Sequence, residues 1–476
     1  MATTSTSTPG ATGGAVPLFH RSATELLGGY ASGALSPVDV VEAVLARVAE
    51  KEPVVGAFYR YEPEQARQAA TDAADRWARG APRGPLDGVP VTIKENIAKE
   101  GLPMPGGTAA QEPVIAERNA PITDRILEAG GVILGTTTMP DWGMLSSGVS
   151  SLHGITRSPW NPAWTTGGSS AGAGAAAAAG YAPLNVGTDI GGSVRLPAAW
   201  QGLVALKPSA GRVPLDTPYL GRAAGPITRT VADAALLMSV LSRPDIRDYT
   251  AMPHQHIAWT EPGHGSAGLR VGVHTDAGAG EAADPAVVAA VEAAAGLFAD
   301  AGAEVSTIRP FIDQGMLEDL DDFWRVRFFA RYRALSAAEQ ARVLPFVARW
   351  CARGEHVDGA TAIEKYDSIA AMRAATIAAT APYDLVLSPV APMAAFAAEQ
   401  PMPYPDPETT MTHIAFTVPY NMSGQPASSI NCGFTADGRP IGLQVAGRPF
   451  QDLQVLQATG WYEQHRPAAA IPAWPA

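Results

Sequence analysis

Short β-type runs alternate with helical stretches from Val89 onward, and this alternation limits the possible folds more than any other feature of the chain. The run VPVTI (89–93) is followed by a helical stretch at 121–129 and then by VILG (132–135). Strands that alternate with helices in this way build α/β layers around a sheet. The sequence therefore predicts an α/β fold with a mainly parallel central sheet.

The same alternation continues toward the C-terminal end. Further strands are expected at 184–187, 203–206, 269–273, 384–388, 428–433 and 441–446, and further helices at 230–242 and 285–301. The last two strands are separated by the short segment TADGRP, which is typical of a hairpin turn.

Three segments lie outside this alternation. Residues 16–84 are predicted to form an N-terminal helical layer, because SATE (22–25) fits a capping box and SP (36–37) fits a helix start. Residues 311–382 are helical and rich in aromatic side chains, so they either pack on the body or form a cap that shapes a substrate pocket. Residues 1–15, rich in Ser, Thr and Gly, are expected to be a flexible tail.

Composition excludes several classes of protein. The 476 residues carry a formal net charge of −12, and 46% of them are hydrophobic. This much apolar sequence excludes intrinsic disorder, and an acidic chain lacks the basic face that nucleic acid or an anionic membrane would bind. No stretch of about 18 strongly apolar residues is present, and Cys351 and Cys432 are too few for a disulfide framework. We expect a soluble protein of the cytoplasm.

Residues 165–208 carry the strongest functional signal. They include TTGGSSAGAGAAAAAG, in which Ser169 and Ser170 open an Ala-rich helix, and NVGTDIGGSVRLPA, in which two glycines precede Ser193. Glycines before a serine allow a sharp turn and leave successive N–H groups free to face an anion, as in an oxyanion hole beside a nucleophile. The alternative is that each serine simply caps a helix.

Lys94 is a candidate base for such a serine, which becomes nucleophilic only when its proton is removed. Of the nine histidines, only His153 is near these loops in sequence, although the fold could bring another one close. Lys94 closes the predicted strand VPVTI, where burial would lower the pKa of its amine toward neutrality. The alternative is a strand-end lysine that extends to solvent.

Three other motif matches carry less weight. The sequence GSSAG (168–172) fits the nucleophile elbow of α/β-hydrolases, but a proline-broken loop precedes it where the elbow needs a strand. The glycine-containing segment 278–283 lacks the acidic partner of a dinucleotide-binding fingerprint, so we expect an ordinary strand–helix connection. His254 and His256 lack a third ligand, so we expect no metal site.

Taken together, the motifs resemble those of the amidase signature family, in the same order and over nearly the whole chain. The matching segments are PLDGVPVTIKENI (85–97), TTTMPDWGMLSSG (136–148), GGSSAG (167–172), GTDIGGSVRLPA (187–198), GLVALKPS (202–209), GPITRTVADAALLM (225–238), LSPVAP (387–392) and GLQVAG (442–447). The resemblance implies the amidase-signature fold. In that fold, residues 16–476 would form one domain with a large, mixed, mainly parallel sheet covered by helices on both faces.

The resemblance also implies a Ser-Ser-Lys triad. Ser193 would be the nucleophile, Lys94 the base, and Ser169, which would follow a cis peptide bond, the serine between them. Ala171 departs from the family pattern, which usually has glycine after the two serines. Because alanine fits the first turn of a helix, we expect a small local shift there and no loss of the triad.

Other residues would surround this triad. The oxyanion hole would use, besides the N–H group of Ser193, the backbone N–H groups of Ile190, Gly191 and Gly192. Supporting side chains would be Ser170, Thr188, Asp189 and Arg195, the last two as a pair behind the site.

The predicted function is hydrolysis of amides, and also of carbamates (urethanes) and esters, through a serine acyl-enzyme without a cofactor. An apolar pocket for an aryl or alkyl group is expected from Gly143, Met144, Leu145, Trp324 and Phe328. We expect a small-molecule substrate and a chain that works as a monomer or homodimer. The alternative is a glutamine-hydrolysing component of a tRNA-dependent amidotransferase, which shares the triad but needs partner subunits and an acidic glutamine site.

Overall fold

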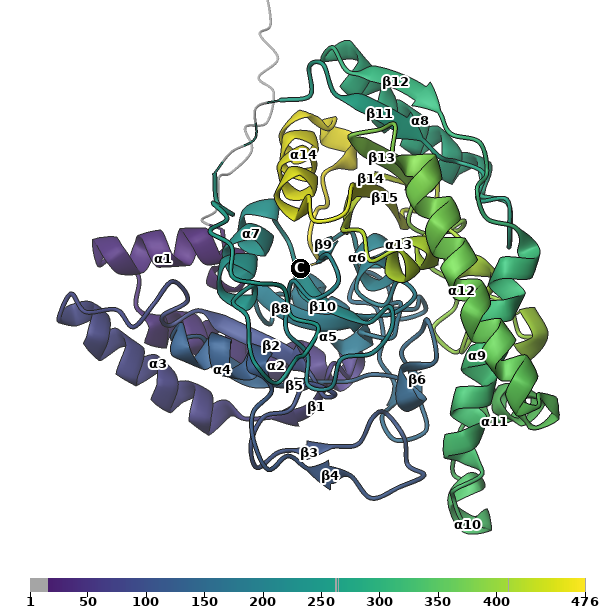
Figure 1. The fold of residues 1–476 in the computed structure, drawn as a ribbon. Coiled ribbons are helices and arrows are strands. Elements are labelled where there is room, and N and C mark those ends of the chain that lie inside the picture. Colours follow the sequence, from purple (N-terminus) through teal and green to yellow (C-terminus); the bar gives the residue numbers. More distant parts are fainter. Residues whose placement is uncertain (1–15, 262, 264, 410, 476) are drawn as a thin grey trace, which may run out of the picture.

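An 11-stranded sheet runs through the described part of the chain, which comprises residues 16–475 apart from 262, 264 and 410. Figure 1 shows this computed structural model, and the tail predicted at residues 1–15 lies outside the described residues. The strands lie in the spatial order β1 (Phe58–Tyr61), β5 (Val132–Thr137), β2 (Pro90–Lys94), β8 (Leu184–Asp189), β10 (Ala223–Thr228), β9 (Val204–Lys207), β14 (Ala427–Phe434), β15 (Pro440–Gly447), β13 (Leu385–Pro389), β11 (Arg270–Val273) and β12 (Glu304–Thr307).

The structure confirms the α/β fold with a large mixed sheet and corrects one detail, because the sheet is not mainly parallel. Within the described residues, parallel pairing is confined to β5, β2 and β8 toward one end and to β13, β11 and β12 toward the other. Strand β10, which the sequence pattern did not reveal, lies between β8 and β9 and is antiparallel to both. Its Gly225-Pro226 step conceals the strand signal. The predicted hairpin of β14 and β15 extends this antiparallel centre.

Helices cover both faces of the sheet. One face packs against α4 (Pro121–Glu128), α7 (Val231–Leu241), α8 (Pro285–Asp300) and α14 (Asp452–His465), which share the largest apolar cluster. The other face packs against α5 (Ala171–Ala179) and α6 (Arg195–Gln201). Successive residues of β9 divide between these faces, since Val204 and Leu206 join the first cluster and Ala205 the second.

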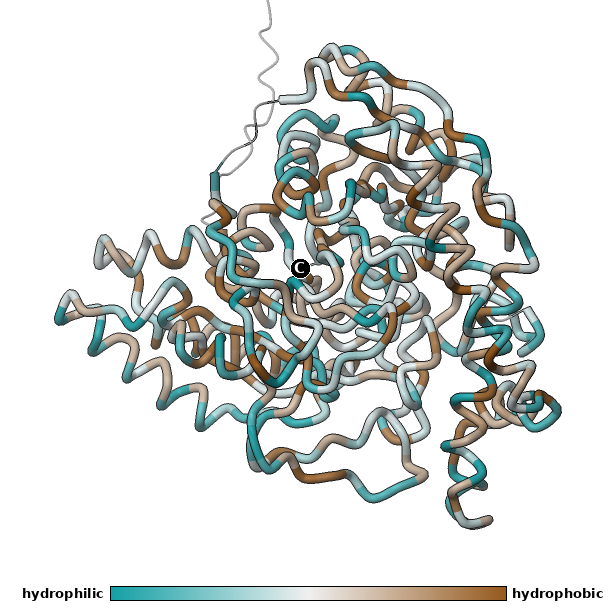
Figure 2. Tube along the Cα trace, in the orientation of Figure 1, coloured by the Kyte–Doolittle hydropathy of each residue, from teal (hydrophilic) through white to brown (hydrophobic). Residues whose placement is uncertain are grey.

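The N-terminal segment wraps the β1 edge of the sheet. It contains α1 (Ala23–Ser32), α2 (Pro37–Val55) and α3 (Pro63–Ala78), with the predicted capping box at Ser22 and the predicted N-cap at Ser36. It also contributes β1, which the expectation of a purely helical layer omitted. In Figure 2 the outer helix α3 is largely hydrophilic, because its fully buried residues are the small alanines Ala66, Ala70 and Ala73.

Residues 311–382 form a group of helices beside the sheet, at the right of Figure 1. They are α9 (Gln314–Tyr332), α10 (Ala337–Gln340), α11 (Pro345–Ala352) and α12 (Gly359–Thr380). Helix α9 packs against α11 and α12, and its side chain Trp324 joins an apolar cluster with Met144 and Leu145 of the body.

The remaining elements are short. Besides 3-10 helices of three or four residues, the described part of the chain contains α13 (Val418–Met422), the pair β3 (Pro103–Met104) and β4 (Val114–Ile115), and the pair β6 (Val149–Ser150) and β7 (Gly154–Ile155). Among the described residues, no helix is both long enough and apolar enough to cross a membrane.

Candidate active site

Lys94 and the two serine loops meet at one edge of the sheet. Strand β2 ends at Lys94 and runs parallel to β8, which ends at Asp189. Because carboxyl ends of parallel strands open at the same edge, the side chains that follow them share a crevice. Ser169 and Ser170 reach this crevice from the start of helix α5, which packs against both strands.

Lys94 is fully buried and surrounded by hydroxyl groups. Its Nζ lies 2.8 Å from Ser169 Oγ, 3.1 Å from Ser170 Oγ and 3.2 Å from Thr188 Oγ1. The nearby carboxylates of Glu95 and Asp189 pair with His153 and Arg195 instead. The surroundings of Lys94 therefore solvate the amine without providing a close counter-charge.

This environment favours the neutral form of the Lys94 amine. Burial first, and then the positive charge of Arg222, lower the pKa of Lys94 from its usual 10.5 to about 7. Desolvation disfavours the charged form of a lysine, and a neighbouring cation disfavours it further. Of the two alternatives that the sequence left open, a buried lysine and one that extends to solvent, the structure shows the buried one.

The two serines before α5 are held closely by their neighbours. The Gly168–Ser169 peptide bond is cis, and Ser170 is the N-cap residue of α5. Glycine is required opposite Ser170, because a Cβ on Gly187 would lie 2.6 Å from Ser170 Oγ. Helix α5 begins at Ala171, so the departure from the family pattern falls at a helical position, as expected.

The Ser193 loop is anchored by a buried ion pair between Asp189 and Arg195. Arg195 donates from Nη2 to Asp189 Oδ1 at 3.0 Å and from Nε to Asp189 Oδ2 at 3.1 Å. The same carboxylate accepts the backbone N–H of Val194 at 3.0 Å and the side-chain amide of Asn421 at 2.8 Å. Burial alone would raise the pKa of Asp189, but Arg195 and these donors hold it well below its usual range.

One member of the predicted oxyanion hole is corrected. Gly192 donates its N–H to Asp189 Oδ1 at 2.8 Å, so this donor holds the loop and is not free to bind an anion. The N–H groups of Ile190, Gly191 and Ser193 have no acceptor within the part of the chain that the structure describes. These three residues also line the cavity beside the loop, whereas Gly192 does not.

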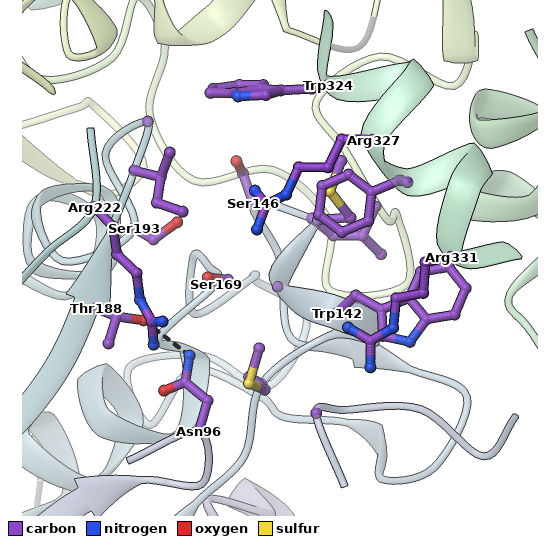
Figure 3. A pocket seen from close by; sticks show the side chains of 18 of the residues that line it. Asn96, Trp142, Ser146, Ser169, Thr188, Ser193, Arg222, Trp324, Arg327 and Arg331 are labelled. Carbon is purple, nitrogen blue, oxygen red and sulfur yellow. Dashed lines mark hydrogen bonds between the residues drawn. The ribbon is translucent and has the colours of Figure 1, made fainter. Parts of the chain in front are cut away.

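A cavity of about 360 Å³ adjoins these groups. Ser169 and Ser193 both line it, and Figure 3 shows their side chains on the same side of the cavity. Lys94 Nζ is hydrogen-bonded to Ser169 Oγ. Among the described residues, Ser193 Oγ forms no hydrogen bond to either of these two side chains. Lys94 itself lies behind Ser169, outside the lining.

The structure places all five predicted substrate-binding residues on this cavity. Gly143, Met144 and Leu145 line it from the loop after β5, and Trp324 and Phe328 line it from α9. Met144, Leu145 and Trp324 belong to one buried apolar cluster, which gives this wall its apolar character.

Sequence reasoning missed the polar side chains of the cavity. Asn96 donates to Thr188 Oγ1 at 3.1 Å, and this is the dashed contact in Figure 3. The other polar side chains that were missed are Ser146, Arg222, Arg327 and Arg331. A signal existed for two of them, since Arg327 and Arg331 are four residues apart on α9 and share the face of Trp324 and Phe328. The segment around Arg222 gave none.

The histidines near the site do not contact Ser169 or Ser193. His153 Nε2 lies 2.9 Å from a carboxylate oxygen of Glu95. The fold does bring His413 close, but its Nε2 lies 2.8 Å from Ser146 Oγ. Ser146, like Ser169, is therefore a serine of the cavity that contacts a potential base, here His413. In the described ranges, no group of three or more His, Cys, Asp or Glu side chains could hold a metal ion.

Comparison with known proteins identifies the class. A family model described as Amidase matches residues 39–456. The acylamidase of Rhodococcus erythropolis is 35% identical over 464 residues, which cover 95% of this chain and 97% of that protein. A glutamyl-tRNA(Gln) amidotransferase component from Symbiobacterium thermophilum is 34% identical, covering 91% of this chain and 94% of that protein.

Solved structures agree with this class. A bacterial aryl acylamidase of the amidase signature family superimposes with a TM-score of 0.84 at 26% identity, covering 94% of this chain and 97% of that one. A substrate complex of 6-aminohexanoate cyclic dimer hydrolase gives a TM-score of 0.86 at 28% identity, covering 97% and 100%. Fold and relatives together define an amidohydrolase. The chain belongs to the amidase signature family.

Proposed function

We propose that this amidohydrolase cleaves small-molecule amides through an acyl-enzyme on Ser193, with Lys94 as the base and Ser169 as the relay between them. The observation that supports this assignment best is the 2.8 Å contact between Lys94 Nζ and Ser169 Oγ, made by a fully buried amine whose pKa is about 7. Ser193 faces the same cavity as Ser169 and stands beside backbone N–H groups that have no acceptor among the described residues.

In the first half-reaction, neutral Lys94 takes a proton from Ser169 Oγ, and Ser169 takes the proton of Ser193 Oγ. The Ser193 oxygen forms a bond to the carbonyl carbon, whose oxygen becomes negative and accepts hydrogen bonds from the N–H groups of Ile190, Gly191 and Ser193. The C–N bond then breaks, and the proton returns through Ser169 to the leaving nitrogen.

In the second half-reaction, water takes the place of the amine. Lys94 accepts a proton of the water through Ser169, the hydroxyl oxygen attacks the acyl carbon, and the bond to Ser193 Oγ breaks as that oxygen regains a proton. A side-chain rotation of Ser193 toward Ser169 completes the relay when substrate is bound, since such contacts commonly tighten only in the complex.

Carbamates and esters are proposed as further substrates of the same site. Both present a carbonyl carbon that a serine can attack and a leaving group that the relay can protonate. The oxyanion donors bind the carbonyl oxygen, which is present whether the leaving atom is nitrogen or oxygen. The relative rates therefore depend on leaving-group chemistry and on the fit of the substrate to the cavity.

The cavity gives no support to glutamine as the substrate. Among the described residues that line it, none is Asp or Glu, whereas three are arginines. The ammonium group of a free amino acid would therefore enter a positively charged site without a counter-charge. We propose a hydrolase that releases its amine product to solvent.

Two serine variants test the assignment. Ser193→Ala should lower the kcat for a para-nitroanilide at least about a thousandfold, because the nucleophile is removed. Ser146→Ala is the matched control, since it removes a serine of the same cavity that contacts a histidine. Retained turnover in Ser193→Ala, or loss of it only in Ser146→Ala, would contradict the proposal.

A further inference from the structure

Three arginines line the cavity from two different parts of the chain. Arg222 lies immediately before β10, and Arg327 and Arg331 lie one turn apart on α9. In Figure 3, Arg222 extends down beside Thr188 and Asn96, Arg327 points toward the centre of the cavity, and Arg331 lies over Trp142. The three cations thus surround the space in front of Ser169 and Ser193.

The charges of these arginines are not neutralised by the protein. The cavity lining contains no carboxylate among the described residues, and Arg222 instead donates from Nη1 to the backbone oxygen of Thr217 at 3.3 Å. Burial, reinforced at Arg222 and Arg331 by the charge of Arg327, lowers the pKa of all three guanidinium groups, and no carboxylate contributes a large opposing effect. Charges that are partly removed from water normally have partners, and the half-buried Arg222 and Arg327 have no carboxylate partner among the described residues, which indicates a missing anion.

Aromatic rings cover the guanidinium faces and leave their edges available. The Arg327 guanidinium lies 3.6 Å from the ring centre of Tyr219, and that of Arg331 lies 5.0 Å from the ring centre of Trp142. An arginine stacked on a ring keeps its N–H donors in the plane of the guanidinium, where they match the two oxygens of a carboxylate. Tyr219 also forms a side-chain hydrogen bond with Arg327, but it brings no negative charge at neutral pH, so these ring contacts hold Arg327 and Arg331 in place without neutralising them.

The position of each arginine suggests different roles. Arg222 and Arg327 are half-buried, so a ligand that pairs with them displaces water from both partners. Arg331 is exposed and also lines the cavity, so its charge would attract anions that approach. The whole chain has a net charge of −12, so this positive cavity is a local feature and does not follow from the overall composition.

We propose that the substrate of this enzyme carries a carboxylate, bound by Arg222 and Arg327, in addition to the amide bond that is cleaved. This inference rests on the proposed function and names its substrate class. The apolar side chains between the arginines and the serines, such as Met144 and Phe328, fit a hydrocarbon or aryl spacer. Monoamides of dicarboxylic acids and N-acylated amino acids have this chemistry, and neither carries a free ammonium group.

Two matched pairs of substrates test the proposal. Glutaric acid mono-para-nitroanilide and pentanoic acid para-nitroanilide differ by a carboxylate on the acyl side. In the second pair, para-acetamidobenzoate and para-acetamidotoluene differ by a carboxylate on the amine side. We expect kcat/KM to favour the carboxylate member of at least one pair by about tenfold or more, as a charge-assisted contact allows. A ratio near or below one in both pairs overturns the inference.

Arginine variants connect this preference to the named residues. Arg222→Met and Arg327→Met should each reduce the kcat/KM ratio of the favoured pair by about tenfold. Arg333→Met is the control, because Arg333 is exposed at the C-terminal end of α9 and does not line the cavity. The ratio compares two substrates in one sample, so a loss of folded enzyme cancels. An unchanged ratio in both cavity variants, or an equal fall in the control, contradicts the proposal.

A binding measurement separates this inference from the proposed function. Calorimetry with Ser193→Ala should show at least about tenfold tighter binding of the carboxylate member than of its neutral partner. Equal affinities overturn the inference even if the wild-type enzyme cleaves both compounds through Ser193. Tighter carboxylate binding without Ser193-dependent cleavage supports the arginine site and contradicts the proposed chemistry instead.

Discussion

Lys94 Nζ lies 2.8 Å from Ser169 Oγ, and Lys94 is fully enclosed by protein. Ser170 and Thr188 supply two further hydroxyl contacts to the same nitrogen. A lysine held by hydroxyl groups alone can give up its proton near neutral pH, and a proton removed from Ser169 has a short path to it. The consequences of this contact can be measured.

The pH dependence of hydrolysis should report the Lys94 amine. Its pKa is lowered to about 7, so the neutral form, which is the base in the proposed mechanism, is scarce in acid and predominant in alkali. We predict that kcat/KM for a neutral anilide rises about tenfold per pH unit below pH 7 and levels off above it. Stopped assays between about pH 5 and pH 9 would show this, and a rate independent of pH over that range would argue against Lys94 as the base.

Two lysine substitutions can distinguish a catalytic role of Lys94 from the general effect of removing a buried lysine. Lys94→Met should lower kcat by about a hundredfold to ten-thousandfold, the usual effect of losing a general base. Lys207→Met is the matched control, because Lys207 is also buried with a pKa lowered to about 7 but bonds to the backbone oxygen of Pro208. The control should keep the pH midpoint of the wild type. If both variants changed kcat and the midpoint equally, the effect would reflect burial and not a role for Lys94 in proton transfer.

Removing the Asp189 carboxylate should destabilise the protein. Asp189→Asn leaves the buried Arg195 charge without its partner, and such losses typically cost about 3–5 kcal/mol in the free energy of unfolding. Urea unfolding would measure this cost. Arg67→Ala, which removes the exposed pair with Glu42, should cost less than about 1 kcal/mol. Similar small costs for both substitutions would show that the Asp189–Arg195 pair does not hold the loop.

Adding one methyl group should have opposite effects at two helical glycines. A Cβ on Gly172 in α5 would lie 2.3 Å from the Ala57 oxygen and 2.5 Å from the Thr138 nitrogen, so Gly172→Ala should destabilise by about 1–3 kcal/mol. A Cβ on Gly296 in α8 would meet nothing within 4 Å, so Gly296→Ala should stabilise by about 0.5–1 kcal/mol. Thermal unfolding distinguishes the signs, and stabilisation by Gly172→Ala would contradict the close packing of α5.

Several features of the fold and site could be predicted because their signals are local in sequence. Strand–helix alternation, the helix start at Ser36 and the burial of Lys94 at the end of a strand each depend on a few neighbouring residues. The contact between Lys94 and Ser169 joins segments far apart in the chain. Only the resemblance to a family pointed to it, since spacing along the chain does not say which loops meet.

Other features depend on what the fold places opposite a residue. Strand β10 contains Gly225 and Pro226, which conceal its strand character until β8 and β9 supply partners on both sides. The N–H of Gly192 looked available although Asp189 lies only three residues before it, because the sequence does not show which backbone donors the Asp189 side chain turns toward. The cavity was predicted as apolar although Arg327 and Arg331 share one face of α9 with Trp324 and Phe328, and only Arg222 comes from a segment that gave no signal.

The most direct test of the central claim is to find which residue a mechanism-based reagent labels. A fluorophosphonate reacts with an activated serine, and peptide mass mapping locates the adduct. We predict a single adduct on Ser193, present in wild type and in Ser146→Ala, lost in Ser193→Ala and strongly slowed in Lys94→Met. An adduct on Ser146 in the wild type, or undiminished labelling of Ser193 without Lys94, would contradict the Ser193–Ser169–Lys94 assignment.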